Sequence, residues 1–440
     1  MANDAARATY DPAGEVVDLC RDLIRIDTSN YGDDSGPGER KAAEHVAALL
    51  DEVGIESELF EQERGRTSLI AHWGGPAGGP GALLLHGHLD VVPAAAEDWQ
   101  VDPFSGELRD GYLWGRGAVD MKDFDAMLLS VVRARTRAGE VPERPVVLCF
   151  TADEEAGGHL GAQVLVEQHR EHLEHCTEAV GEVGGFSATI RGQRLYLVQA
   201  AEKGMAWMRL TARGRAGHGS MINDDNAVSR LAAAVARIGA HQWPVRLTPT
   251  METLLAAVGE IAGVEATPAN AQVLVEEFGG AARMMGAVIR NTANPTMLSA
   301  GYKVNVIPTE ASAHVDGRFL PGYEDEFFDT LAELCGDGIE RSFVSHQQPW
   351  ETPYDGDLVD AMTRCLLAED PEARVAPYLM SGGTDAKHFN ALGLRSYGFT
   401  PLRLPSDLDF TALFHGVDER VPVDALEFGA RVLDRFLSHL

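Results

Sequence analysis

Short apolar runs of strand length alternate with amphipathic helical segments in the first part of the chain, and this alternation constrains the fold more than any other feature. The strand-like runs are SLIAHW (68–73), ALLLHGHLD (82–90) and VVLCFTADEE (146–155). Apolar residues at helical spacing mark the segments 14–30, 38–54 and 121–138. Because strands that alternate with helices favour parallel pairing, we expect an α/β fold with a mixed, mostly parallel sheet flanked by helices.

The glycine-rich segment GGPAGGPG (74–81) could be taken for a phosphate-binding loop. It lacks the following Lys-Ser/Thr pair and precedes a strand rather than a helix. We therefore expect a hairpin connection at this segment.

The pattern changes near residue 202, which predicts an inserted domain. At 440 residues the chain exceeds what one hydrophobic core usually supports. An alternating strand at KGMAWMRLTARG, a helix at 226–240, two strands through 303–320, then a helix and a last strand form a βαββαβ-like α+β layer. We therefore expect a main domain built from residues 1–201 and 351–440, and an inserted domain at 202–350.

Composition and charge exclude several kinds of partner. The net charge of -30 argues against nucleic acid and anionic membranes, because phosphate contacts need clustered Lys and Arg. No apolar run is long enough to span a bilayer, and the N-terminus lacks the apolar region of a secretory signal. The cysteines form no CxxC pair, so they indicate reduced thiols and a cytoplasmic location; they are Cys20, Cys149, Cys176, Cys335 and Cys365.

Histidines and carboxylates follow several of the apolar runs, where an α/β enzyme places its chemistry. His88 and Asp90 share one face of a strand, so the carboxylate can accept a hydrogen bond from the ring and leave the other ring nitrogen for a metal. Asp120, in GRGAVDMK, lies at the start of a helix. Glu154 and Glu155 follow a buried strand, where like charges favour a cation between them. Taken singly, each motif also fits a helix-start aspartate or a solvated acidic turn.

Two further candidates carry weaker signals. Glu182 precedes a pair of glycines in GEVGG, and His415 lies in the loop sequence FHGVDER, where a lone histidine is usually just solvated. Together with the other motifs they offer two imidazoles and three carboxylates as ligands. That set suits two zinc ions that share one bridging carboxylate.

In this order, these residues resemble the M20 family of zinc amidohydrolases and metallopeptidases, from about residue 14 to the C-terminus. The resemblance implies two Zn²⁺ ions per subunit, replaceable by Co²⁺ or Mn²⁺. It implies that Asp120 bridges both ions, that Glu155 and His415 complete one site, and that His88 and Glu182 complete the other. The family commonly has a cis peptide after the bridging aspartate.

The resemblance also assigns the remaining side chains of the site. Asp90 would orient the first histidine ligand, and Glu154 would be the general base. GRAGHGS places His218 where the family polarises the scissile carbonyl, often from a dimer partner. NVIP and DGRF place Asn305 and Arg318 at substrate contacts, and the arginine fork suits a terminal carboxylate. The loop SGGTD would line the pocket through Gly382, Gly383 and Thr384.

The activity implied by the resemblance is hydrolysis of an amide bond in a small substrate with a free carboxylate. Metal-bound water, activated by Glu154, would attack an N-acyl amino acid or the C-terminal bond of a short peptide. The main domain would be catalytic, and the insert would be a lid or dimerisation domain of a homodimer. The family does not specify whether the chain is a peptidase, an aminoacylase or a desuccinylase.

The chain departs from the family at two places, and two alternatives stay open. Asp123 stands where the family often has glycine, and the insert carries an extra segment near 250–295, as in the carboxypeptidase S branch. The pair His86 and His88 is also compatible with a TIM-barrel amidohydrolase, although no suitably placed bridging lysine is evident. A catalytically inactive binding protein on the same fold would have lost a ligand or the base.

Overall fold

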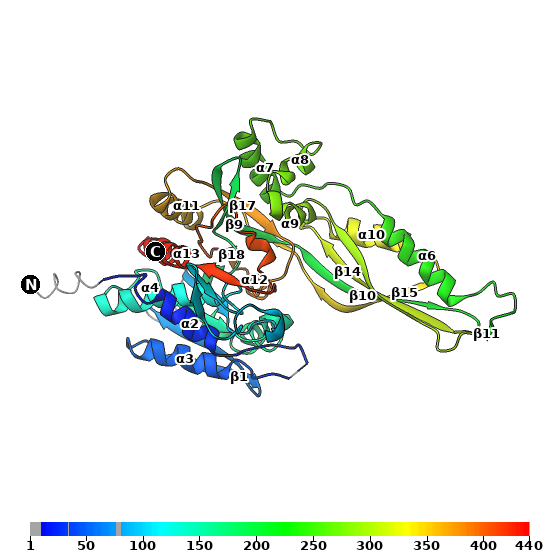
Figure 1. Ribbon diagram of the computed structural model, residues 1–440, viewed down its shortest axis with the longest axis horizontal. Coiled ribbons are helices and arrows are strands. Elements are labelled where there is room, and N and C mark those ends of the chain that lie inside the picture. Colours follow the sequence, from blue (N-terminus) through cyan, green and yellow to red (C-terminus); the bar gives the residue numbers. More distant parts are fainter. Residues whose placement is uncertain (1–9, 34, 76–80, 440) are drawn as a thin grey trace, which may run out of the picture. The chain divides into compact units, whose positions relative to one another are not determined.

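The computed structural model describes residues 10–33, 35–75 and 81–439, and Figure 1 shows their helices and strands. The chain separates into two units. The first comprises Met1–Ala200, Thr352–Tyr378 and Thr384–Leu440, and the second comprises Ala201–Glu351 and Leu379–Gly383.

The first unit is built around a mixed sheet whose middle strands run parallel. In spatial order these are β6 (Val146–Thr151), β3 (Ala82–His88), β7 (Cys176–Gly181) and β18 (Arg395–Gly398). Every residue of β3 and β6 is buried, as unbroken apolar runs require in strands covered on both faces. Antiparallel strands flank them: β1 (Ser57–Glu63), β2 (Arg66–Trp73), β8 (Phe186–Ile190) and β9 (Gln193–Glu202).

Helices cover both faces of this sheet. On one side pack α2 (Val16–Arg25), α3 (Arg40–Asp51), α4 (Lys122–Ala138), α11 (Asp357–Glu369) and α13 (Val423–Leu437). On the other, α5 (Ala162–Gln168) and α12 (Ala386–Asn390) contribute Leu165 and Phe389 to a core with Ile70 and Leu84. The remaining strands are β17 (Arg374–Met380), which pairs with β9, and the small sheet of β4 (Glu107–Arg109), β5 (Tyr112–Trp114) and β19 (Arg420–Pro422).

This architecture confirms the expected mixed α/β class and rejects two other expectations. The strand order runs in an open path that begins at β1, and antiparallel strands border the parallel ones, so the sheet is not a TIM barrel. Strands β2 and β3 both pair with β6 and not with each other, so the segment between them is not a hairpin. Residues 76–80 of that segment lie outside the described residues.

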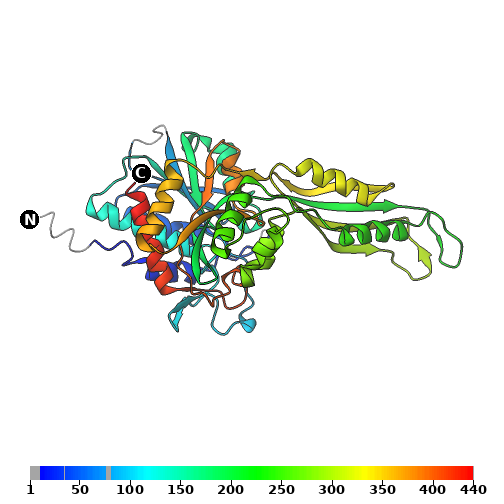
Figure 2. The same cartoon turned by 90° about the horizontal axis from the view of Figure 1, so that it is seen from above.

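The second unit contains a four-stranded antiparallel sheet. In spatial order its strands are β12 (Thr292–Ala300), β14 (Glu310–Phe319), β10 (Gly204–Arg213) and β15 (Ile339–Gln347). Alternate residues such as Met208, Leu210 and Val315 face a core shared with α6 (Ala227–Ala240) and α10 (Glu324–Cys335). The two helices lie side by side against this sheet (Figure 2), and the chain order gives the βαββαβ pattern.

One strand of this layer lies where the sequence did not indicate it. Segment 303–320 contains β14 and the two-residue β13 (Val306–Ile307), whereas β14 pairs with β10 on one side and with β12 on the other. Only Ala293 is buried in β12, so the strand carries little apolar alternation. The extra segment near 250–295 forms α7 (Pro249–Ala262), α8 (Ala271–Glu276) and α9 (Ala282–Ala287), and β16 (Trp350–Glu351) pairs with the end of β9.

Within the described part of the chain, no helix has both the length and the apolar character needed to cross a membrane.

Candidate metal centre and substrate-binding groups

Six titratable side chains come together in the first unit. They are His88, Asp120, Glu154, Glu155, Glu182 and His415. Three neighbouring parallel strands supply four of them, because His88 ends β3, the Glu154–Ala156 turn follows β6, and Glu182 follows β7. The carboxyl ends of parallel strands meet at one edge of a sheet, which is why the residues converge.

Asp120 stands between two imidazoles at the centre of this cluster. Its Oδ1 lies 3.1 Å from His88 Nε2, and its Oδ2 lies 3.3 Å from His415 Nε2. Each imidazole nitrogen faces one more carboxylate: Glu182 Oε2 lies 3.3 Å from His88 Nε2, and Glu155 Oε2 lies 3.0 Å from His415 Nε2. Two histidine–glutamate pairs thus share one aspartate, and the peptide bond after Asp120 is cis, as the resemblance implied.

The electrostatics of the cluster favour a bound cation. Burial, followed by the charge of Glu182, raises the pKa of Glu154 well above its usual range, and burial raises the pKa of Glu182 to about 7. Burial also raises the pKa of Glu155, whose Oε1 is buried without a hydrogen-bond partner. Hydrogen bonds with Asp120 and Glu155 raise the pKa of His415 to about 10. Divalent cations would supply the positive charge that keeps these carboxylates ionised, and one of them would bind the unpartnered Oε1 of Glu155. The donor set therefore fits a metal pair.

The contacts of Asp90 differ from those expected. His88 Nδ1 lies 2.9 Å from the backbone oxygen of Asp90 and 3.6 Å from its Oδ1, so the carbonyl accepts the ring N–H. Since a carbonyl can only accept, Nε2 is left as the ring nitrogen for a metal. The Asp90 carboxylate instead accepts the backbone N–H groups of Glu154 and Glu155, each at 3.1 Å.

His86, the basis of the TIM-barrel alternative, belongs to the core. Its ring packs against Phe389, with the ring centroids 4.8 Å apart. Burial, and then the charge of His88, lowers the pKa of His86 to about 3, which keeps this imidazole neutral.

In the second unit, the pairing of β11 (Gly217–His218) with β13 brings His218 beside Asn305. The backbone N–H of Gly219 donates to the backbone oxygen of Asn305 at 3.0 Å, and both predicted side chains are exposed. The backbone N–H of Ser220 lies 3.3 Å from His218 Nδ1. Because an N–H group only donates, Nδ1 accepts, and the neutral ring carries its proton on Nε2.

Arg318, near the end of β14, lies beside the loop that was expected to line the pocket. Its Nη1 donates to the backbone oxygen of Ser381 at 3.5 Å, and residues 382–383 follow directly. The guanidinium is also paired with Asp316, with 2.8 Å between Nε and Oδ1. Thr384 is buried, and its hydroxyl accepts the backbone N–H of Ala386, the first residue of α12, at 3.2 Å.

Strand β11, which carries His218, lies beyond one end of the second unit's four-stranded sheet (Figure 1), and Arg318 lies near the other end of that sheet. Arg318 pairs with Met205 at the start of β10, and β10 runs on to Arg213, beyond which the chain reaches β11. Met205 and Arg213 are eight positions apart, which is ~26 Å at the rise of a β-strand. His218 and Arg318 of one chain are therefore separated by about the length of this sheet.

Sequence reasoning missed several buried carboxylates near the cluster, among them Glu419 and Asp385. Glu419 accepts the backbone N–H of Val119 at 2.8 Å and pairs with Arg116 at 2.6 Å, which fixes the loop before α4. Asp385 accepts a hydrogen bond at 2.6 Å from the hydroxyl of Thr151, the last residue of β6. Both stand in motifs already singled out, FHGVDER and SGGTD, which was the available signal.

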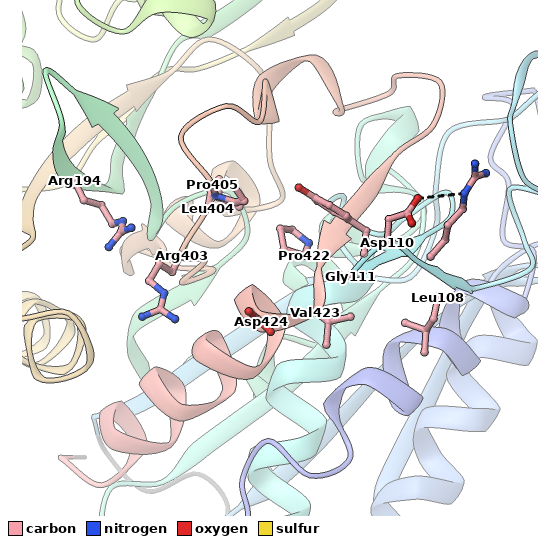
Figure 3. A pocket seen from close by; sticks show the side chains of 12 residues that line it. Leu108, Asp110, Gly111, Arg194, Arg403, Leu404, Pro405, Pro422, Val423 and Asp424 are labelled. Carbon is pink, nitrogen blue, oxygen red and sulfur yellow. Dashed lines mark ion pairs between the residues drawn. The ribbon is translucent and has the colours of Figure 1, made fainter.

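A cavity of about 620 Å³ lies in another part of the first unit, and Arg194, Arg403 and Asp424 are among the residues that line it (Figure 3). None of its 12 lining residues belongs to the six-residue cluster. Arg194 is already paired with Asp370 at 2.5 Å. The perturbed carboxylates and imidazoles, and not the size of a cavity, therefore identify the candidate site.

Residues 84–439 match the model of Peptidase family M20/M25/M40. The chain is 29% identical over 431 residues to the N-fatty-acyl-amino acid synthase/hydrolase PM20D1 of Xenopus tropicalis, covering 94% of this chain and 83% of that protein. It is 27% identical over 435 residues to aminoacylase-1 of Pongo abelii, covering 96% and 95%. An M20 family metallo-carboxypeptidase from Sulfolobus solfataricus, Sso-CP2, shares the fold with a TM-score of 0.72 at 18% identity, covering 96% and 98%.

Proposed function

Because the chain belongs to Peptidase family M20/M25/M40 and is a hydrolase, we propose that it cleaves an amide bond in a small substrate that bears a free carboxylate. The substrate would be an N-acyl amino acid or the C-terminal end of a short peptide. The observation that carries the proposal is Asp120 shared between two histidine–glutamate pairs. An aminoacylase and a synthase/hydrolase of N-fatty-acyl amino acids among the relatives support the acyl amino acid class.

We propose a pair of divalent metal ions as the cofactor, with Zn²⁺ as the expected ion and Co²⁺ or Mn²⁺ as substitutes. His88 and Glu182 would hold one ion, Glu155 and His415 the other, and Asp120 both. When bound, the pair would polarise the scissile carbonyl and lower the pKa of a water molecule.

Glu154 is the proposed general base. Its carboxylate lies within 4.8 Å of ligand atoms of both His88 and Glu182, and its backbone is held by Asp90. It would accept a proton from the attacking water and return it to the leaving amine. His218, protonated on Nε2, would donate a hydrogen bond to the carbonyl oxygen as charge develops there.

The substrate carboxylate is proposed to bind Arg318. Arg318→Ala should weaken the binding of free-acid substrates by ~1.5–3 kcal/mol, as expected for loss of a charge-assisted hydrogen bond. Amidated analogues, already poor, should lose little more. The matched control is Arg209→Ala, which removes an exposed strand arginine of the same unit, 3.7 Å from Glu310. Equal losses for acid and amide substrates in KM measurements would reject this assignment.

We propose a homodimer, formed through the second unit, in which His218 and Asn305 act on the site of the other copy. The support is that Arg318 lies near one end of the four-stranded sheet, whereas β11, with His218, lies beyond its other end. Asn305 would contact the same substrate from beside His218, and the backbone of residues 382–383 would line the pocket near Arg318.

Mixing His218→Ala chains with Glu154→Gln chains should restore activity. Each variant alone is expected to be inactive, but in a mixed dimer one site receives both native residues. The control mixes Glu154→Gln with a chain that carries both substitutions, which leaves every site without Glu154. A monomer by sedimentation, with no recovery on mixing, would contradict action between subunits.

The reaction itself is tested by a substrate screen. Dipeptides should be compared with N-acetyl, N-succinyl and long-chain N-acyl amino acids, each with added zinc, cobalt or manganese. Turnover of at least one class is expected, and no turnover of any carboxylate-bearing amide would contradict the proposal. A cytoplasmic location also stays a prediction, supported by five cysteines that are all free and buried.

A further inference from the structure

Asn30 lies behind Glu154 and Glu155, the acidic pair of the cluster. Its side-chain amide makes hydrogen bonds through all four of its donor and acceptor positions. Its Nδ2 donates to Asp90 Oδ2 at 2.9 Å and to Asp153 Oδ1 at 3.1 Å. Its Oδ1 accepts from Arg66 Nη2 at 2.9 Å and from the backbone N–H of Gly32 at 3.0 Å. The amide therefore has no unused hydrogen-bonding capacity.

The neighbours of this amide determine which way it faces. Two carboxylates, those of Asp90 and Asp153, require a donor on one side, and two N–H groups require an acceptor on the other. Arg66 is anchored in turn by Glu39, with 2.5 Å between Nη1 and Oε1. The Arg66, Glu39, Asp90 and Asp153 side chains are all buried, as is Asn30 itself, so solvent cannot replace these contacts.

The backbone holds Asn30 in this place. Its N–H donates to the backbone oxygen of Val91 at 2.9 Å, and the N–H of Val91 donates to the oxygen of Thr28 at 3.2 Å. The segment is thereby tied to the chain that leaves β3. Asp90, in the same stretch, accepts the backbone N–H groups of Glu154 and Glu155.

We propose that Asn30 is a positioning residue for the acidic pair, acting through Asp90 and Asp153. The amide, polarised by the Arg66 guanidinium, donates to both carboxylates and fixes their direction. Asp90 then holds the backbone of Glu154 and Glu155, and Asp153 precedes them in the chain. This inference rests on the proposed function, in which Glu154 is the base and Glu155 a metal ligand.

The isosteric substitution separates this role from simple packing. Asn30→Asp keeps the size of the side chain but places a third carboxylate against Asp90 and Asp153, where charge repulsion displaces both. Asn30→Ala only removes the donor. A packing role would make the isosteric variant the milder one, whereas the positioning role makes it the more damaging one.

The test compares these variants in the cobalt-loaded enzyme, with the N-acyl amino acid or dipeptide that turns over fastest in the screen. Asn30→Ala should lower kcat ~10-fold and Asn30→Asp ~100-fold, the range seen when groups behind metal ligands are lost, with KM within about twofold of the native value. The dipicolinate concentration that removes half of the bound cobalt should fall ~10-fold. The control, Ser130→Ala, breaks a part-buried 2.7 Å hydrogen bond to the backbone oxygen of Pro12 in the same unit. It should lower the Tm without changing kcat or metal retention.

Two further variants keep the inference falsifiable. Arg66→Lys retains the buried charge but cannot bond Glu39 and Asn30 through two nitrogens, so it should lower kcat about threefold even if the Asn30 variants do not fold. Glu154→Gln belongs in the same assay. If Glu154→Gln is inactive while Asn30→Asp is as mild as Asn30→Ala or milder, or Arg66→Lys is unchanged, the positioning role is wrong. If Glu154→Gln stays active, the proposed function itself fails.

Discussion

Glu154→Gln is expected to lower kcat by ~10²–10⁴-fold while leaving the metal content near native. The amide cannot take a proton from water at neutral pH, but it is close in size to the carboxylate and leaves the Asp120-centred donor set intact. The native Glu154 carboxylate lies beside Glu182 and His88, and burial raises its pKa, so it holds a proton more readily than an exposed glutamate. Steady-state kinetics and elemental analysis of the same preparation measure both quantities.

The matched control is the neighbouring residue. Glu155→Gln should reduce metal occupancy, because Glu155 Oε2 faces His415 Nε2 at 3.0 Å and its Oε1 is buried without a partner. His415→Ala should do the same. If Glu154→Gln empties the site and Glu155→Gln does not, the roles of the two glutamates are exchanged.

Chelation of the metal should abolish turnover, and added Zn²⁺ or Co²⁺ should restore it. The physical reason is that buried carboxylates, the buried His88 ring and the half-exposed His415 ring surround Asp120, and only a cation makes their charged forms compatible. The measurement is activity against metal content during stepwise removal and return of the ion. Binding only to the folded chain also predicts a lower Tm after removal.

The control for chelator damage is reconstitution of the same sample. Ca²⁺, which prefers oxygen ligands, should restore little activity at a site with two imidazoles. Full activity in protein shown by elemental analysis to contain no metal would contradict the proposed cofactor.

Most of the candidate site at the carboxyl ends of the parallel strands could be predicted, because it follows from sequence patterns within single segments. The apolar runs of β3 and β6 are stable only when buried on both faces, so their polar ends must emerge at one edge. His88 and Glu154 could be placed together for that reason. His415 could not: its side chain is 55% exposed in an irregular loop, where a lone histidine is a weak signal, and only the family resemblance assigned it to one metal site.

Other features depended on contacts between distant segments and had no local signal. Strand β12 is mostly exposed and lacks alternation, so its pairing with β14 was not visible in the pattern. The spacing of Asp90 and His88 allowed a contact between the carboxylate and the ring. In the structure the backbone carbonyl of Asp90 accepts the ring N–H, and its carboxylate accepts the backbone N–H of Glu154.

By itself, the sequence determined which donor atoms are present, the α/β class and the membership of a hydrolase family, because periodicity, burial and motif order are local properties of the chain. Only the tertiary structure decided how those donors are shared. Asp120 contacts His415 because a loop near the C-terminus packs against the start of α4. Asn30 donates a hydrogen bond to Asp90, which is 60 residues away in the sequence. The register of β10 and β14 places Arg318 near one end of the four-stranded sheet, and β11, with His218, lies beyond the other end. Neither sequence motif reveals this separation, because it depends on the length of the paired strands.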